Sequence, residues 1–205
     1  MPKFPEPPLN LATLPAITKT LRTGTLLWRV YFHAGPHPTT WDAFRGFGPT
    51  GSRFDHQVPP PSVQTRALLY AAASGPTCLA EVFQDTRIID RSRRSPWLVG
   101  FGLTRSVELL DLTGSWPTRA GASMAINTGP RSRARRWSQA IYAAYPNVQG
   151  LCYCSSMDAN RAAMALYERA TSAMPASPVF HRALADPLLA PAISRAALQF
   201  NYGVV

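Results

Sequence analysis

The sequence predicts an α+β protein with a single main domain. Predicted strands and helices follow one another without the regular β-α-β alternation of a doubly wound sheet. At 205 residues the chain is long enough to bury one substantial core. It contains no internal repeat and no low-complexity tract. We therefore divide it into a proline-rich N-terminal lead, residues 1–24, and one folded domain, residues 25–205.

The first half of the chain predicts two apolar strand-like segments, one long loop and one helix. The lead is expected to be irregular and to wrap the surface. Residues 25–32 show little alternation of apolar and polar residues, which indicates a strand buried on both faces. Arg29 interrupts this apolar run. Residues 33–62 are rich in glycine and proline and predict a loop, which its aromatic residues keep ordered. Residues 66–73 form a strand or a short apolar segment. A helix follows from residue 74 to about residue 85, with Pro76 in its first turn.

The second half predicts more strands and two longer helices. Strands are expected at residues 97–103, 106–112, 148–154 and 179–183. Between them, residues 113–130 are rich in turn formers. Residues 131–144 predict a helix because apolar residues recur there at helical spacing, and residues 187–200 predict a closing helix for the same reason. Residues 158–170 contain helix formers, but their structural type stays open.

Charge and cysteine content limit the functional classes. The formal net charge is +10, carried by 19 arginines and two lysines, which favours an anionic partner such as nucleic acid, a phosphate-bearing small molecule or an acidic protein. No apolar run suits a membrane helix, and the lead has no apolar signal-peptide core, so a cytoplasmic protein is expected. Three cysteines and four scattered histidines predict neither a disulfide framework nor a metal site.

Four residues are candidates for chemistry, and each has a simpler structural interpretation. Glu81, between apolar residues of a predicted helix, suits a general base or a carboxylate that stabilises a developing cation; its alternative is an ion pair with Arg29 or Arg53. Arg29 suits an anion anchor or a strand-end salt bridge. Arg53, in a glycine-led turn, suits an anion site or an exposed loop position. Tyr70 suits stacking on a flat ring or a place in the core.

The order of these residues resembles the RES-domain family, which is named for its arginine, glutamate and serine. Six segments carry the resemblance: Trp28-Arg29-Val30-Tyr31, Gly51-Ser52-Arg53-Phe54-Asp55, Leu69-Tyr70-Ala71-Ala72, Leu79-Ala80-Glu81-Val82, Trp137-Ser138-Gln139-Ala140 and the strand from Gln149 to Ser156. No single segment is specific, but the ordered set over residues 25–185 is. Ser52 and Asp55 replace the family's usual glycine and asparagine.

This resemblance implies a fold like that of ADP-ribosyltransferase toxins, with a split, mostly antiparallel sheet around a cleft. It implies an enzyme that breaks the N-glycosidic bond of NAD, with phosphate or water as acceptor, and a cognate antitoxin partner. Catalytic roles fall to Glu81, Arg29 and Ser138, the last near a helix start where it would help hold a phosphate. Substrate-binding roles fall to the residues Arg53, Tyr70, Tyr31 and Ser155. The family's serine is either Ser138 or Ser155, and Ser138 is preferred. NAD is the substrate and no further cofactor is expected.

Two rival functions remain open from the sequence. An ADP-ribosyltransferase acting on a macromolecule would share the NAD site and differ only in the acceptor. A nucleic-acid-binding module would use the arginines between Arg131 and Arg136, beside Trp137. That cluster equally suits a surface that meets an acidic antitoxin or a solvated helix face. Direct nucleic-acid binding is not expected, because no zinc, helix-turn-helix or RNA-binding aromatic motif is present.

Overall fold

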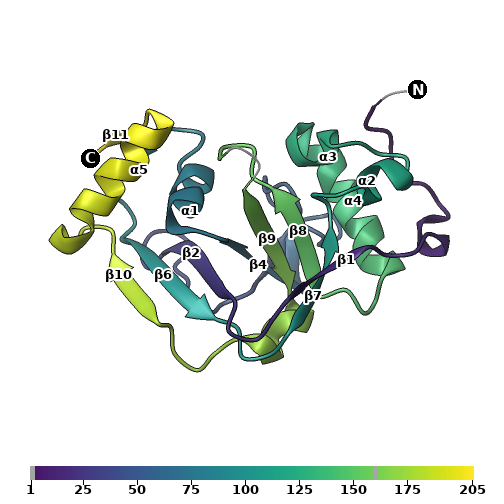
Figure 1. Ribbon diagram of the computed structural model, residues 1–205, viewed down its shortest axis with the longest axis horizontal. Helices are drawn as coiled ribbons and strands as arrows, with labels where there is room; N and C mark the ends of the chain where they lie inside the picture. The colour runs from purple at the N-terminus through teal and green to yellow at the C-terminus, as the bar shows by residue number, and fades with distance from the viewer. Residues whose placement is uncertain (1–2, 159–160) are drawn as a thin grey trace.

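One mixed sheet organises the protein. The computed structural model describes residues 3–158 and 161–205. Within them, nine strands form a sheet in the spatial order β1-β7-β8-β9-β4-β2-β6-β10, with β3 paired to β4. These strands are β1 (Thr18–Leu21), β2 (Leu26–Phe32), β3 (Arg45–Gly48), β4 (Ser62–Ala72), β6 (Pro96–Gly102), β7 (Val107–Asp111), β8 (Gly150–Cys154), β9 (Ala162–Tyr167) and β10 (Phe180–Ala183). All neighbours in it run antiparallel except β7 and β8, so the predicted α+β class with a mixed sheet is confirmed (Figure 1).

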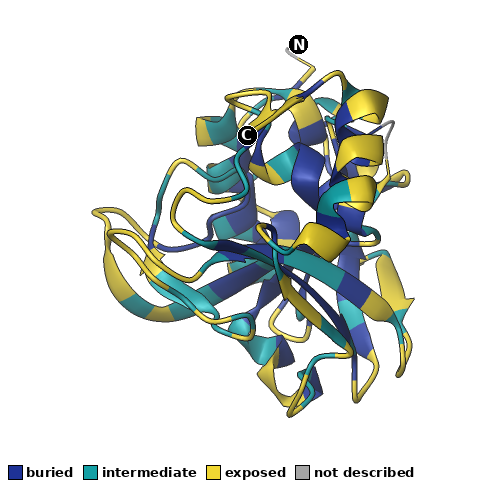
Figure 2. Cartoon of the chain, turned by 90° about the vertical axis from the view of Figure 1, so that its left-hand side faces the viewer, coloured by how far each residue is buried: buried dark blue, intermediate teal, exposed yellow. Residues whose placement is uncertain are grey.

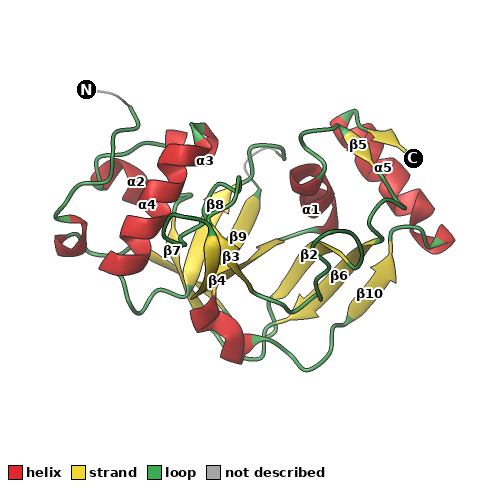
Figure 3. Cartoon of the chain, turned by 180° about the vertical axis from the view of Figure 1, so that it is seen from behind, coloured by secondary structure: helices red, strands yellow, loops and turns green. Residues whose placement is uncertain are grey.

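Helices flank this sheet. They are α1 (Gly75–Val82), α2 (Trp116–Arg119), α3 (Ala125–Thr128), α4 (Arg131–Ala144) and α5 (Ala190–Phe200), with short 3-10 turns at Leu11–Thr13, Glu168–Ala173 and Pro187–Leu189. The larger hydrophobic core joins α1, α4 and α5 to one sheet face, and a smaller core lies on the other face. A small parallel pair, β5 (Ile88–Ile89) with β11 (Gly203–Val204), closes the C-terminal end. Figure 3 shows α1 between α5 on one side and α2, α3 and α4 on the other.

The sheet divides at the junction of β2 and β4. These two strands share a single register pair, Trp28 with Ala72, whereas β2 pairs with β6 along its whole length. Helix α1 follows β4 directly and packs against both strands at this division. Its start is well defined, because the Ser74 side chain accepts a hydrogen bond from the Thr77 amide at 3.2 Å and Pro76 occupies the first turn. The sheet is therefore split, as predicted, and α1 stands where its halves part.

Several local expectations need correction. The lead is not merely irregular surface: β1 pairs with β7, and Phe4 and Leu11 are buried in the larger core. The predicted loop 33–62 contains β3 and the start of β4. The segment left open at 158–170 forms β9 and a 3-10 turn, apart from residues 159–160, which lie outside the described residues. Its helix formers become a strand because β9 is buried between β8 and β4, and packing outweighs propensity.

Burial follows the layers. Figure 2 shows buried residues along the strands and on the inner sides of the helices, with exposed residues on the outer sides. Strand β2 is less enclosed than predicted, because Leu26 at its start is exposed while Leu27 and Val30 are buried. None of the helices formed by the described residues has the length and apolar character needed to cross a bilayer.

Candidate active site

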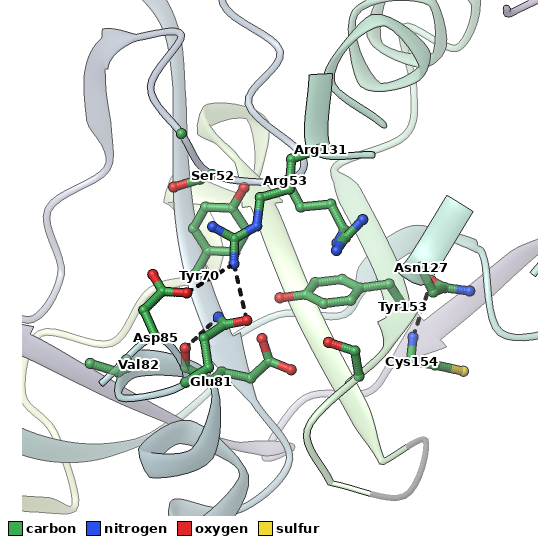
Figure 4. Close-up of a pocket in the computed structure, with 13 residues that line it drawn as sticks. Ser52, Arg53, Tyr70, Glu81, Val82, Asp85, Asn127, Arg131, Tyr153 and Cys154 are labelled. Atoms are coloured by element: carbon green, nitrogen blue, oxygen red, sulfur yellow. Dashed lines mark hydrogen bonds and ion pairs between the residues drawn. The ribbon is translucent and has the colours of Figure 1, made fainter. Parts of the chain in front are cut away.

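A cleft of about 440 Å³ opens beside the C-terminal end of α1. Its walls come from the loop after β3, from β4, from the end of α1, from the start of α4 and from the end of β8, so it draws together segments far apart in sequence (Figure 4). The residues that line it are Gly51, Ser52, Arg53, Tyr70, Glu81, Val82, Gln84, Asp85, Asn127, Arg131, Tyr153, Cys154 and Ser156. The predicted residues Arg53, Tyr70 and Glu81 thus share one cavity, of a size that suits a small-molecule ligand.

Glu81 holds the last turn of α1 against the turn that follows β8. The buried hydroxyl of Ser155 donates a hydrogen bond of 2.5 Å to Oε1 of Glu81. The same hydroxyl accepts from the amides of Met157 and Asp158, both at 3.1 Å. Among the described residues Glu81 has no cationic partner within 4.0 Å, so the alternative of an ion pair with an arginine is not realised. A carboxylate held at one oxygen in a cleft is suited to act on a cationic centre.

Arg53 is placed by a loop whose anchor is the buried carboxylate of Asp55. That carboxylate pairs with Arg45 at 2.6 Å and accepts from the amide and hydroxyl of Thr50 at 2.6 and 2.7 Å. A buried carboxylate requires such partners, and they fold residues 48–55 into a compact turn. The Arg53 guanidinium donates one hydrogen bond to the Gly129 carbonyl at 2.5 Å. Among the described residues it makes no other hydrogen bond, so its remaining donors are open to the cleft.

Two arginines, Arg53 and Arg131, line the same cleft and lie close enough for their charges to interact. Burial lowers the pKa of Arg53, and the nearby charge of Arg131 lowers it further, while the charge of Glu81 opposes the change. Arg131 reaches across the mouth of the cleft to Gln84 at 3.1 Å and to Asp85 at 3.6 Å. The repulsion between two like charges in one partly desolvated space falls when an anion binds between them.

Two tyrosines form the apolar walls. Tyr70 accepts a hydrogen bond from the Phe54 amide at 2.9 Å and donates to Asp55 at 3.3 Å. Tyr153 packs against Phe54, with ring centroids 4.7 Å apart. Burial raises the pKa of both phenols well above its usual value, so both rings are neutral over the physiological range. Neutral rings at the wall of a polar cleft suit a flat, weakly polar ring of a ligand.

Arg29 and Tyr31 do not line the cleft. The Arg29 guanidinium donates to the carbonyls of Trp41 and Ala43, each at 3.0 Å, and so holds the loop after β2. Burial lowers the pKa of Arg29 to about 10. The Tyr31 hydroxyl lies 2.7 Å from Nε2 of His181 on β10. Side chains alternate between the two faces of a strand, so Arg29 and Tyr31 lie on the opposite face of β2 from Trp28 and Val30. Trp28 and Val30 are the residues that pack with α1 in the larger core.

Ser138 is also separated from the other candidates. It lies two turns into α4 rather than near a helix start, so the expected phosphate contact at a helix N-terminus is wrong. It faces the core with Trp137 and Ile141, and its hydroxyl donates to the Phe54 carbonyl at 2.7 Å. Ser138 therefore supports the loop that carries Arg53, whereas the serine that contacts Glu81 is Ser155, the less favoured of the two.

Most of the lining residues were not among the predicted site residues, and three of them have clear structural roles. Tyr153 belongs to the strand that carries part of the family resemblance, but nothing local distinguishes a wall tyrosine from a core tyrosine. Arg131 belongs to the cluster expected to meet nucleic acid, an antitoxin or solvent, but its place at the first position of α4 brings it to the cleft. Asn127 is buried, donating to the Leu112 carbonyl at 3.1 Å and accepting from the Cys154 amide at 3.3 Å. Within residues 3–158 and 161–205, no group of three or more potential ligands is placed to hold a metal ion.

Comparisons with known proteins agree with this architecture. The model of the RES domain family matches residues 26–188. A chain of the crystal structure of the M. tuberculosis MbcT–MbcA toxin–antitoxin complex superimposes with a TM-score of 0.53 at 17% sequence identity, covering 79% of this chain and 85% of that chain. A search among curated proteins finds no match. The structural likeness establishes the fold, and the family model covers the segments that carry the cleft.

Proposed function

We propose that this protein, which belongs to the RES domain family, is a toxin-like enzyme that cleaves the N-glycosidic bond of NAD and releases nicotinamide. The observation that carries the proposal is Glu81, held at one oxygen by Ser155 and placed in one cleft with Arg53. A carboxylate, a guanidinium in the same cleft and aromatic walls are groups that suit this reaction.

The chemistry follows from the charge that develops on the sugar. When the bond from C1′ to the pyridine nitrogen breaks, its electron pair leaves with nicotinamide, which becomes neutral and needs no acid catalyst. The ribose acquires oxocarbenium character, and a carboxylate such as Glu81 stabilises it. The new bond to C1′ then forms either from an oxygen of water, which loses one proton to solvent, or from an anionic oxygen of phosphate. Arg53 and Arg131 suit the pyrophosphate or the acceptor anion, and Tyr70 or Tyr153 suits the nicotinamide ring.

The decisive experiment identifies products. Purified protein free of any partner is incubated with NAD, with and without inorganic phosphate, and the products are analysed by mass spectrometry. Free nicotinamide is expected in at least one condition; ADP-ribose alone indicates hydrolysis, and a phosphorylated product formed only with phosphate indicates phosphorolysis. Transfer of ADP-ribose to a protein would instead support the macromolecular transferase. NAD left intact by folded protein in both conditions would reject the proposal.

A protein antitoxin is the proposed partner, because uncontrolled NAD consumption would damage the producing cell. The fold is shared with a chain of a toxin–antitoxin complex. The basic cluster on α4 is a weaker docking surface than its sequence indicates, since Glu6 pairs with Arg136 at 2.6 Å and with Arg133 at 3.2 Å. The same pairing weakens the case for nucleic-acid binding. The mouth of the cleft is the surface an inhibitor would cover.

Co-expression tests this partner. Wild-type chain expressed alone should halt growth, and the product of an adjacent gene should restore growth and block NAD cleavage in vitro. Normal growth with abundant folded protein, and no neighbouring gene product that binds it, would contradict the toxin role.

A further inference from the structure

Among the described residues, two side-chain hydrogen bonds tie helix α1 to residues 155–158, the turn after β8, and one of the two involves Glu81. The Thr77 hydroxyl donates to Oδ2 of Asp158 at 2.6 Å, and the Ser155 hydroxyl donates to Oε1 of Glu81 at 2.5 Å. Thr77 and Glu81 are four residues apart on α1 and therefore lie on the same side of the helix. The two hydrogen bonds thus act as parallel links between one helix face and one turn.

These links form a continuous chain of contacts. Asp158 donates its amide to the Ser155 hydroxyl at 3.1 Å, so the position of Asp158 helps to set the direction in which that hydroxyl points. Met157 donates a second amide to the same oxygen. With both acceptor positions filled, the Ser155 hydroxyl has its proton directed to Glu81. Thr77 therefore acts on Glu81 through Asp158 and Ser155.

Burial makes this series of hydrogen bonds stiff. Thr77, Ser155 and Asp158 are 0, 1 and 4% exposed, and none of the three lines the cleft, whereas Glu81 does. A buried carboxylate and buried hydroxyls are costly to leave unpaired, and hydrogen bonds are stronger in a medium of low dielectric constant. These three residues lie behind the cleft wall, where substrate does not reach them.

We propose that Thr77 and Asp158 are positioning residues for Glu81. They hold α1 and the turn in register so that Ser155 binds one carboxylate oxygen and the other is presented to the sugar. This rests on the proposed function. Misplacement of a reacting group by about 1 Å costs on the order of 100-fold in rate, so loss of the Thr77 link should be measurable without loss of the fold.

The test compares two substitutions of one residue. Thr77→Val keeps the shape but removes the hydroxyl, and Thr77→Ser keeps the hydroxyl. We expect Thr77→Val to lower kcat about tenfold or more with KM for NAD within about twofold of wild type, and Thr77→Ser to recover most of kcat. Thr20→Val is the control, because Thr20 donates to Glu108 at 2.5 Å on the β1–β7 edge of the sheet, outside the cleft.

A second measurement needs no substrate. The carboxyl ¹³C resonance of Glu81, assigned by its loss in Glu81→Gln, should move in Thr77→Val and stay near its wild-type position in Thr77→Ser and Thr20→Val. A folded Thr77→Val protein with wild-type kcat, or with an unmoved Glu81 resonance, would overturn the positioning role. Equal loss of kcat in Thr77→Ser would overturn it too. If wild-type protein leaves NAD intact, the proposed function fails, and the resonance comparison still decides whether Thr77 positions Glu81.

Discussion

Replacing Glu81 by glutamine gives the sharpest test of the proposed chemistry. The substitution keeps the size of the side chain and a hydrogen-bonding oxygen for Ser155, but it removes the negative charge. If the sugar cation lies about 4 Å from the carboxylate, an effective dielectric constant of about 20 gives an attraction of about 4 kcal/mol. Each 1.36 kcal/mol corresponds to a factor of ten in rate, so the upper value is near 1,000-fold. The cleft is open to solvent, and we expect a loss of about 100-fold to 1,000-fold in kcat.

The assay measures rate and stability on the same sample. Nicotinamide release is followed at saturating NAD, and the melting temperature is recorded for wild type, Glu81→Gln and Glu108→Gln. Glu108 is the matched control, because it is a glutamate on β7 whose carboxylate accepts from Thr20, away from the cleft. Glu81→Gln should keep its melting temperature near that of wild type and lose activity. A Glu81→Gln enzyme with near-normal kcat and a lowered melting temperature would refute the reasoning and make Glu81 a structural residue.

Three further predictions concern Arg53 in the cleft and three residues outside it. Arg53→Lys should weaken NAD binding about tenfold in calorimetry with little change in stability. Arg29→Lys should lower the free energy of unfolding by about 2 kcal/mol and leave the affinity for NAD unchanged. Weaker NAD binding in Arg29→Lys would show that Arg29 is an anion anchor after all. Ser138→Ala should cost about 1–2 kcal/mol in urea unfolding, because the Phe54 carbonyl loses its buried donor; an unchanged stability would contradict this. Burial alone raises the pKa of Glu168, but contacts from His56, from the Tyr142 hydroxyl and from a backbone amide outweigh it and lower the pKa to about 2 from 4.5. The folded-state pKa is the depressed one, so this stabilisation is complete above about pH 4.5 and is lost as the pH falls toward 2. After allowance for partial exposure it is about 1–2 kcal/mol, and Glu168→Gln should flatten the stability profile between pH 6 and pH 3.

Local pattern was sufficient for most elements of the fold. Strands β6, β7, β8 and β10 and helices α1, α4 and α5 coincide with predicted segments to within a few residues. Each is defined by apolar spacing or by turn formers at its ends, which are properties of neighbouring residues. Strand β9 was not recognised because its residues favour a helix, and only its burial between β8 and β4 makes it a strand.

The candidate site was predictable in part for a related reason. The sequence by itself determined that Glu81, Arg53 and Tyr70 belong to one ordered set of segments, and the fold brings these three to one cleft. It could not determine which serine meets Glu81, since Ser138 and Ser155 both lie beside apolar residues.

Tertiary structure decided these partners, because a side chain's role depends on which groups from distant segments lie within hydrogen-bonding distance. Ser138 lies on the core-facing side of α4, where its hydroxyl donates to the Phe54 carbonyl. Ser155 lies in the turn after β8, which packs against the helix that carries Glu81. In the same way, the alternation of β2 turns Arg29 toward the carbonyls of the following loop rather than toward the cleft. Periodicity along the chain identifies an element and its apolar face, but hydrogen-bond partners are set by how the elements pack.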